Sequence, residues 1–288
     1  MSDFKVFCRT ASLLCAFCLP ASTAWGACLG DRTAPKTLTF AVVPQMQRSV
    51  TYSKWAPLLE HVGLRAKLCF DLVIPETITA FEKLLLKGQP DLAFANPYHA
   101  VMAKKRQGYA PLLMDGSMKL SGILTVKADG PITDIRDLNG KEVAFPSANA
   151  FAASLLIRGE LAKQGIQIFP KYAHTHANAY RAAALGEVSA AGGVNNTWQR
   201  EDPALRASLR ILFETAGYAP HPLVAHPRLA PSVKKLFASA VMALPSNEVG
   251  QKLLNDVQMS QPVLANYQRD FAPLERLDLE KFVVLHEN

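Results

Sequence analysis

The chain has 288 residues, of which 49% are hydrophobic and 19% charged, and its formal net charge is +7 at pH 7. This length suits one large or two ordinary domains, and the apolar share supports a packed core and excludes a disordered chain. The basic residues are spread along the sequence without Lys/Arg blocks or interleaved aromatic residues, which argues against a nucleic-acid-binding protein. A mild basic excess favours an anionic partner.

The N-terminus has the layout of a secretory signal peptide. Lys5 and Arg9 precede an apolar run over 11–19, and small residues follow Pro20. The run is about half as long as a membrane-spanning helix, and no later segment reaches about 20 apolar residues. We therefore expect an exported, periplasmic protein that loses residues 1–26, which lowers the net charge from +7 to +6 because Lys5, Arg9 and Asp3 leave with the signal peptide.

Two of the five cysteines, Cys28 and Cys69, remain after this cleavage. An exported compartment is oxidising, and two cysteines in such a compartment usually pair. We therefore predict a disulfide between Cys28 and Cys69. Two alternatives stay open. In the first, Cys28 is the acylated residue of a lipoprotein, although Trp25 is a poor match to the usual Leu of the cleavage box. In the second, Cys69 is a free thiol that binds a soft ion.

Short apolar strands alternate with amphipathic helices along the mature chain, which is the pattern of an α/β protein. In the first part we expect strands at 37–43, 66–73 and 92–95 and helices at 55–62, 78–87 and 98–107. A second unit has expected strands at 122–126, 142–145, 172–174 and 190–194, and expected helices at 150–164 and 177–185. Strands at 210–214 and 223–226 then lead back to the first unit, which helices at 231–243 and 248–256 complete.

Seven stretches of the chain are informative when they are taken together. They are Phe-Ala-Val-Val-Pro at 40–44, Trp-Ala-Pro-Leu-Leu at 55–59, Gly-Gln-Pro-Asp-Leu-Ala-Phe at 88–94, Asp-Leu-Asn-Gly-Lys at 137–141, the strand, turn and helix start at 145–154, Thr-His at 175–176 and Gly-Glu-Val at 186–188. In this order they resemble the periplasmic substrate-binding proteins of phosphate, phosphite and phosphonate ABC importers. Each motif alone is weak, but the resemblance covers nearly the whole mature chain.

The resemblance implies a type II periplasmic binding protein, with two mixed sheets flanked by helices and a ligand cleft between two lobes. After the signal peptide at 1–26, the first lobe is expected at 27–118 and 218–288, and the second at 119–217. The expected partners are a small anionic solute and an ABC permease in the inner membrane, and the protein itself is expected to be a monomer. Rotation of hinged lobes around a solute buries it more fully than an open groove does.

The turn at 146–151, between a predicted strand and a predicted helix, is the expected centre of the site. Free N–H groups and a partial positive charge at a helix start favour an oxyanion. Family members carry a Ser-Thr-Ser run where this chain has Ala148, Asn149 and Ala150, so backbone amides are expected to replace hydroxyls as donors. The alternative is that Ser147 or Asn149 only caps the helix.

A histidine of the family's cleft corresponds to His176, whose neutral ring can donate one hydrogen bond to an anion. The complete set of expected ligand-binding residues is Ser147, Asn149, Ala150, Phe151, His176, Tyr98, His99 and Asn195. Two departures argue against an aminoalkylphosphonate ligand. Ser189 stands where some relatives have a carboxylate, and Ala95 where a tyrosine is frequent.

We expect no catalytic residues, no metal site and no cofactor. His99, His174, His221 and His226 lie on different predicted elements and lack the spacing of a metal-binding motif, and no nucleophile motif is present. Two other functions, each with a different chemistry, remain as alternatives. One is a periplasmic sensor that reports ligand occupancy to a membrane histidine kinase, and the other is a secreted hydrolase that uses His176 or the His-Pro histidines.

Overall fold

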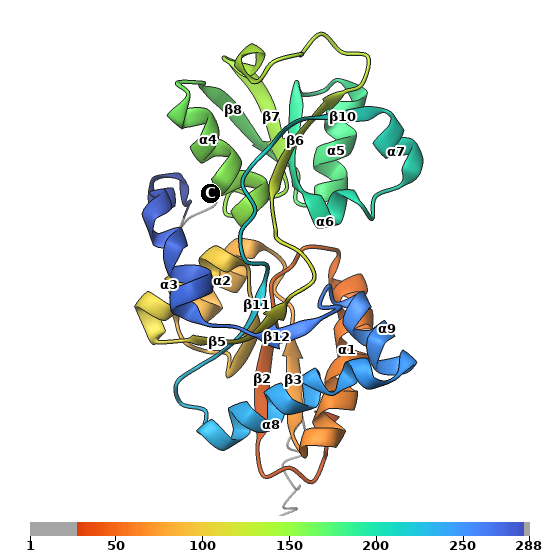
Figure 1. The fold of residues 1–288 in the computed structure, drawn as a ribbon, viewed down its shortest axis with the longest axis vertical. Coiled ribbons are helices and arrows are strands. Elements are labelled where there is room, and N and C mark those ends of the chain that lie inside the picture. The colour runs from red at the N-terminus through yellow and green to blue at the C-terminus, as the bar shows by residue number, and fades with distance from the viewer. Residues whose placement is uncertain (1–27, 285–288) are drawn as a thin grey trace, which may run out of the picture.

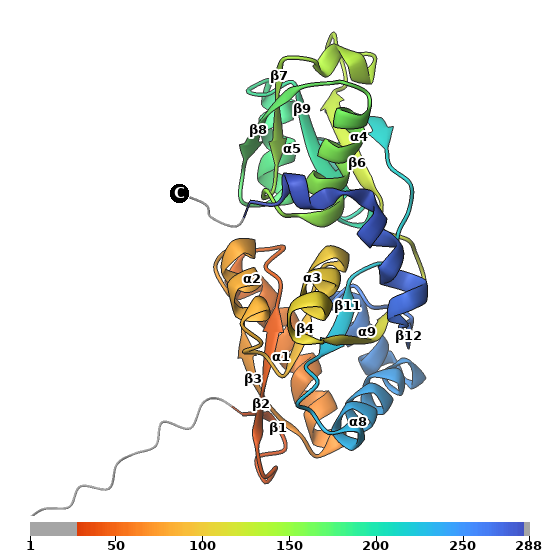
Figure 2. The ribbon, with the colours of Figure 1, turned by 90° about the vertical axis from the view of Figure 1, so that its left-hand side faces the viewer.

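The computed structural model describes residues 28–284, which form two lobes, each built around its own sheet (Figures 1 and 2). The predicted signal peptide at 1–26 lies outside these described residues. Among the helices between residues 28 and 284, none has the length and apolar character needed to span a membrane.

The first lobe contains a seven-stranded mixed sheet. Its strands, in spatial order, are β1 (Leu29–Gly30), β3 (Cys69–Val73), β2 (Thr37–Val42), β4 (Leu92–Phe94), β11 (Pro222–Ala225), β5 (Ala110–Asp115) and β12 (Pro262–Leu264). Strand β2 is parallel to β3 and β4, whereas β11 is antiparallel to β4 and β5. The helices of this lobe are α1 (Arg48–Ala66), α2 (Ile78–Leu86), α3 (Pro97–Gln107), α8 (Pro231–Met242), η3 (Leu244–Ser246), α9 (Glu248–Asp256), η4 (Tyr267–Phe271) and η5 (Ala272–Leu277).

The second lobe contains a five-stranded mixed sheet. Its strands, in spatial order, are β10 (Leu209–Glu214), β6 (Gly122–Lys127), β9 (Ala190–Val194), β7 (Lys141–Phe145) and β8 (Ile168–Tyr172). Strand β7 is parallel to β8 and β9, whereas β6 is antiparallel to β9 and β10. The helices are η1 (Ile135–Leu138), η2 (Phe151–Leu156), α4 (Ile157–Lys163), α5 (His176–Leu185), α6 (Asn195–Trp198) and α7 (Pro203–Ala207).

The predicted fold class is confirmed, because two mixed sheets with flanking helices form two lobes. Strand β10 pairs antiparallel with β6 in the second sheet, inside the expected range of the second lobe, and the chain then returns to the first lobe at β11. One predicted strand is placed differently. Strand β8 begins at Ile168, before the predicted 172–174, and four of its five residues are exposed, so this edge strand lacks the alternation that marks a half-buried strand.

Two segments that join the lobes pair with each other. They connect β5 to β6 and β10 to β11, and the predicted lobe boundaries at 118/119 and 217/218 fall inside them. Leu120 and Tyr218 exchange two backbone hydrogen bonds of 2.9 Å, which couples the two crossings into one ribbon. This arrangement is suited to a hinge, because the lobes can rotate about a short paired segment without disrupting either core.

The end of the described chain forms a third connection that the sequence did not predict. The 3₁₀ turn η6 (Leu279–Phe282) runs up from the first lobe to the side of α4 in the second lobe (Figure 2). Arg158 on α4 donates a 2.6 Å hydrogen bond from Nη2 to the carbonyl oxygen of Phe282. The segment that was assigned to the first lobe therefore contacts both lobes.

The first lobe packs around a group of buried aromatic rings. Phe40 contacts Trp55, Phe70 and Phe237 with ring centroids 5.4–6.1 Å apart, and Trp55 contacts Phe94 at 4.8 Å. Tilted and edge-on ring pairs of this kind add stabilisation beyond the area they bury. Next to Phe70 on β3, a disulfide joins Cys28 to Cys69, with Cα atoms 5.4 Å apart, and ties the N-terminal arm to this strand.

Candidate ligand-binding site

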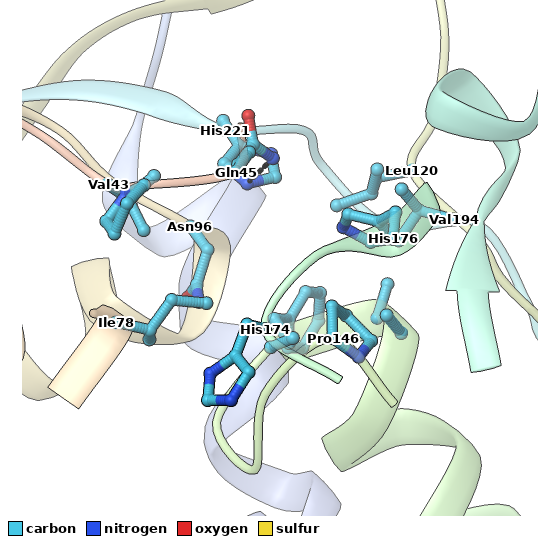
Figure 3. Close-up of a pocket in the computed structure, with 15 residues that line it drawn as sticks. Val43, Gln45, Ile78, Asn96, Leu120, Pro146, His174, His176, Val194 and His221 are labelled. Atoms are coloured by element: carbon cyan, nitrogen blue, oxygen red, sulfur yellow. Dashed lines mark hydrogen bonds between the residues drawn. The ribbon is translucent and has the colours of Figure 1, made fainter. Parts of the chain in front are cut away.

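A small cavity lies between the two lobes, with a volume of about 30 Å³. The first lobe and the hinge contribute Val43, Pro44, Gln45, Ile78, Asn96, Leu120 and His221, and the second lobe contributes Pro146, Ala150, Phe151, Ala152, Ala153, His174, His176 and Val194 (Figure 3). None of these lining residues is Asp, Glu, Lys or Arg. The cavity therefore offers a solute backbone dipoles and imidazole rings in place of fixed charges. It has room for about two water molecules, so a larger solute enters only when the lobes separate.

Unpaired backbone amides make this cavity suited to binding anions. The helix that begins at Phe151 runs through a π-helical turn into α4 and ends at Lys163. The N–H groups of Phe151, Ala152 and Ala153 have no hydrogen-bond acceptor within the described part of the chain, whereas Ser154 and Leu155 both donate to the Ala150 carbonyl oxygen. Three free donors at the positive end of a helix dipole form an anion-binding surface.

Two glycines allow this helix start to lie directly on the sheet. A Cβ atom at Gly122 on β6 would lie 2.2 Å from the Ala152 carbonyl oxygen. A Cβ atom at Gly192 on β9 would lie 2.3 Å from the Ala153 carbonyl oxygen. Any larger residue would therefore push the helix start away from the sheet and move its free amides out of position.

Two buried histidines face the cavity from opposite lobes. His176 begins α5, is 8% exposed, and has no hydrogen-bond partner for Nδ1 within residues 28–284. Burial lowers the pKa of His176 to about 4. His221 accepts a 3.0 Å hydrogen bond from the Gln45 side-chain amide at Nε2 and stacks on Phe94. Burial, helped by repulsion from His99 and His176, lowers the pKa of His221 to about 3. Both rings are therefore neutral at pH 7, and each carries one N–H donor.

The structure brings three of the eight predicted binding residues to the cavity wall: Ala150, Phe151 and His176. Ser147 lines an adjoining pocket, and its buried hydroxyl has no partner among the described residues. The remaining four, which are Tyr98, His99, Asn149 and Asn195, do not line the cavity.

The side chain of Asn149 links the lobes instead of facing the cavity. Its Nδ2 atom donates to Glu82 Oε2 at 2.7 Å and to the Val284 carbonyl oxygen at 2.8 Å. Its Oδ1 atom accepts from the Val284 N–H at 2.9 Å. His99 donates to the other Glu82 oxygen over 2.8 Å, so His99 positions the carboxylate that holds Asn149. Both donor hydrogens of the Asn149 side chain are thus engaged, and none is left for an anionic solute.

Tyr98 and Asn195 also have roles outside the cavity. Tyr98 is 2% exposed, and burial followed by the nearby Glu280 raises the pKa of its hydroxyl. Asn195 lies at the hinge, where its Oδ1 accepts from the Ser121 N–H at 3.3 Å and its Nδ2 donates to the Lys119 carbonyl oxygen at 2.9 Å. Asn195 is therefore suited to hold one crossing segment in place.

Four polar residues of the cavity wall were not predicted: Gln45, Asn96, His174 and His221. Gln45 follows β2 and Asn96 follows β4, and these parallel strands end at the same edge of the first sheet. Ligands of open α/β sheets bind outside the carboxyl ends of the strands, so this rule alone would have indicated both positions. His221 precedes β11, which is antiparallel to β4, and it reaches the same edge from the opposite direction.

Two sheets in two lobes, joined by paired crossings and enclosing a cavity, define the class of two-lobed periplasmic binding proteins. The model of one family, described as the periplasmic substrate-binding protein of phosphonate ABC transporters, matches residues 40–271. The chain belongs to this family. Its members are transport proteins of the periplasm, and they act together with a membrane permease.

Solved structures of low sequence identity share the fold. A binding protein component of an ABC phosphonate transporter from Pseudomonas aeruginosa has a TM-score of 0.75 and 16% identity, with 84% of this chain and 85% of that chain covered. PhnD1 from Prochlorococcus marinus, in complex with methylphosphonate, has a TM-score of 0.76 and 14% identity, covering 84% and 97%. A Xanthomonas citri protein bound to chloride ion has a TM-score of 0.70 and 18% identity, covering 85% and 95%.

Proposed function

We propose that this protein binds a small oxyanion, such as phosphate, phosphite or a simple phosphonate, between its lobes and delivers it to an ABC permease. The observation that carries the proposal is the group of free amides at Phe151, Ala152 and Ala153 on the cavity wall. The methylphosphonate complex of PhnD1 from Prochlorococcus marinus, which has the same fold, supports this class of ligand.

The electrostatics of the cavity support an anion over a cation. No carboxylate lines the wall to repel a negative charge, and the neutral rings of His176 and His221 each supply a further N–H donor. Donors that packing holds in place need little reorganisation free energy on binding. Neutral dipoles are therefore sufficient to hold an oxyanion in a buried site. The family match supports import over the kinase-sensor role and over hydrolysis.

We also propose that the mature protein is a monomer and that Cys28 serves as a disulfide partner. The bond between Cys28 and Cys69 supports this role, because an acylated Cys28 has no thiol left to pair. Under this proposal the protein moves freely in the periplasm and has no lipid anchor.

Isothermal titration calorimetry with phosphate, phosphite, methylphosphonate and sulfate tests the proposed ligand class. At least one of these anions is expected to bind. Ala150→Leu places a larger side chain in the small cavity and is expected to weaken that binding by about 100-fold, or about 2.7 kcal/mol. Ala204→Leu, at an exposed position on α7, is the matched control and leaves the affinity unchanged. The absence of heat and of any thermal shift with all four anions would refute the proposal.

A further inference from the structure

A second, wider groove adjoins the cavity and is not used by the proposed oxyanion site. It has a volume of about 400 Å³ and shares Gln45 and His176 with the cavity wall. The first lobe contributes Gln45, Met46, Gln47, Val50, Lys54 and Gln258, and the second lobe contributes Thr175, His176, Ala177, Asn178, Arg181, Thr197, Arg200 and Glu201. A chemical group in this groove would therefore be held from both sides when the lobes close.

The charge of the groove differs from that of the cavity. Lys54, Arg181 and Arg200 line it, and Glu201 is the one carboxylate among its lining residues. Within residues 28–284, none of the three cations forms a salt bridge. Arg181 donates to the side chain of Asn178, and Arg200 donates weakly to a backbone carbonyl oxygen at 3.5 Å. The groove thus keeps an excess of positive charge, which Glu201 offsets only in part.

A helix start and a buried imidazole connect the groove to the cavity. Helix α5 has ten residues, and the N–H groups of His176 and Ala177 at its start have no acceptor among the described residues. His176 lines both spaces, is 92% buried, and leaves Nδ1 unpartnered there. Figure 3 shows the His176 ring on the cavity wall. A solute that contacts His176 from the cavity is therefore adjacent to the groove.

We infer that the preferred solute carries two acidic groups: an oxyanion head for the cavity and a carboxylate for the groove. This inference rests on the proposed oxyanion site and adds the substrate class. The small cavity admits only the head, and the groove, which is more than ten times larger, accommodates the carbon chain that follows. Met46 and Val50 provide apolar contacts for that chain, and Arg181 and Arg200 provide planar donors for a carboxylate.

The same charges exclude a solute of opposite polarity. An aminoalkyl group in the groove would meet Lys54, Arg181 and Arg200 with only Glu201 to offset them. Like charges placed together in a partly desolvated space reject the wrong ligand as effectively as favourable contacts select the right one.

The test compares four phosphonates of similar size on the full mature chain. Methylphosphonate has no second group, phosphonoacetate and 3-phosphonopropionate carry a carboxylate at two distances, and 2-aminoethylphosphonate carries a cation. We expect one of the two carboxylates to bind at least about tenfold more tightly than methylphosphonate, and 2-aminoethylphosphonate to bind more weakly than methylphosphonate.

A double variant separates the groove from the cavity. Arg181→Gln with Arg200→Gln is expected to remove the preference for the carboxylate and to leave methylphosphonate affinity within about twofold. Arg65→Gln, an exposed position near the end of α1, is the matched control. If methylphosphonate binds but neither carboxylate binds more tightly, the inference is wrong and the oxyanion site stands. If no phosphonate, phosphate, phosphite or sulfate binds, the oxyanion site itself is refuted.

Discussion

Asn149 on the second lobe donates a 2.7 Å hydrogen bond to Glu82 on the first lobe, immediately next to the residues that line the cavity. Glu82 is 3% exposed and also accepts from His99, so this bond lies in a buried polar network. Opening of the cleft at this point exposes or breaks the contact. Because Ala150 follows Asn149 directly, the position of the cavity wall is coupled to the closed arrangement of the lobes.

Asn149→Asp is expected to favour the open arrangement. The substitution replaces the donor to Glu82 with a second carboxylate, which removes a buried hydrogen bond and adds like-charge repulsion. We expect the free energy of unfolding to fall by about 2 kcal/mol and the radius of gyration in small-angle X-ray scattering to increase. Asn247→Asp is the control, because either residue caps the start of α9 equally well. An unchanged radius and stability in Asn149→Asp would contradict the coupling.

Gly192→Ala is expected to displace the start of the binding helix. The added methyl group would lie 2.3 Å from the Ala153 carbonyl oxygen and 2.4 Å from the Phe145 ring, and neither neighbour is free to move far. We expect a loss of about 3 kcal/mol in urea denaturation, together with weaker anion binding. Gly159→Ala on α4 meets only ordinary contacts, so it should be neutral or stabilise the helix by up to about 1 kcal/mol. Equal stabilities for the two variants would argue against close packing at Gly192.

The stability of the unliganded protein should fall on mild acidification. Above pH 6.5 His176 and His221 are neutral in both the folded and the unfolded state, so they add no pH dependence. As the pH falls below 6.5 the unfolded state takes up protons on both rings, whereas the folded state resists until about pH 4 for His176 and about pH 3 for His221. At pH 5 each ring should therefore lower the free energy of unfolding by about 2 kcal/mol relative to pH 7.

The pH effect is measured by urea denaturation at pH 7 and pH 5. The double variant His176→Gln with His221→Gln should lose less stability between these two pH values than the native chain loses. His61→Gln, on α1 and outside the cavity wall, is the control and should follow the native protein. Identical pH profiles for the double variant and the native chain would show that these rings are not buried in the unliganded protein.

Reduction of the Cys28–Cys69 disulfide should destabilise the first lobe. The bond joins residues that are 41 positions apart. Because such a cross-link lowers the entropy of the unfolded chain, it is expected to stabilise the folded state by about 4 kcal/mol. A thermal melt with and without dithiothreitol measures the effect, and the double variant Cys28→Ser with Cys69→Ser should match the reduced protein. Intact mass should be that of a chain starting at residue 27, less two hydrogens. A lipid-sized mass increase or two titratable thiols would favour the alternatives.

The main elements of the fold could be predicted from local sequence patterns, whereas the three strands β1, β5 and β12 could not. Apolar runs and glycine caps located β2, β4, β9 and most helices to within a few residues. Strand β5 was not predicted, and its second residue, Pro111, is of a type that is rare inside strands. The structure accommodates this proline at a β-bulge, where the register with β11 shifts. Strands β1 and β12 have only two and three residues, which are too few for any periodicity.

The site could be predicted only where a local pattern defines it. The strand, turn and helix start at 145–154 indicated the free amides, and three of the residues predicted from the sequence, Ala150, Phe151 and His176, line the cavity. The side-chain partners could not be found this way. Asn149 meets Glu82 across 67 residues and Val284 across 135, and Gln45 meets His221 across 176. Such pairings depend on how two lobes close, which no local pattern records.

The backbone of Val284 carries a practical consequence for work with this protein. Its N–H and carbonyl groups both bind the side chain of Asn149, the residue that precedes the cavity wall. A purification tag or a fluorescent reporter attached directly after Val284 would therefore lie beside a contact between the two lobes. Affinities measured on such fusions would report the fusion partner as well as the native protein, and placing the label elsewhere avoids that error.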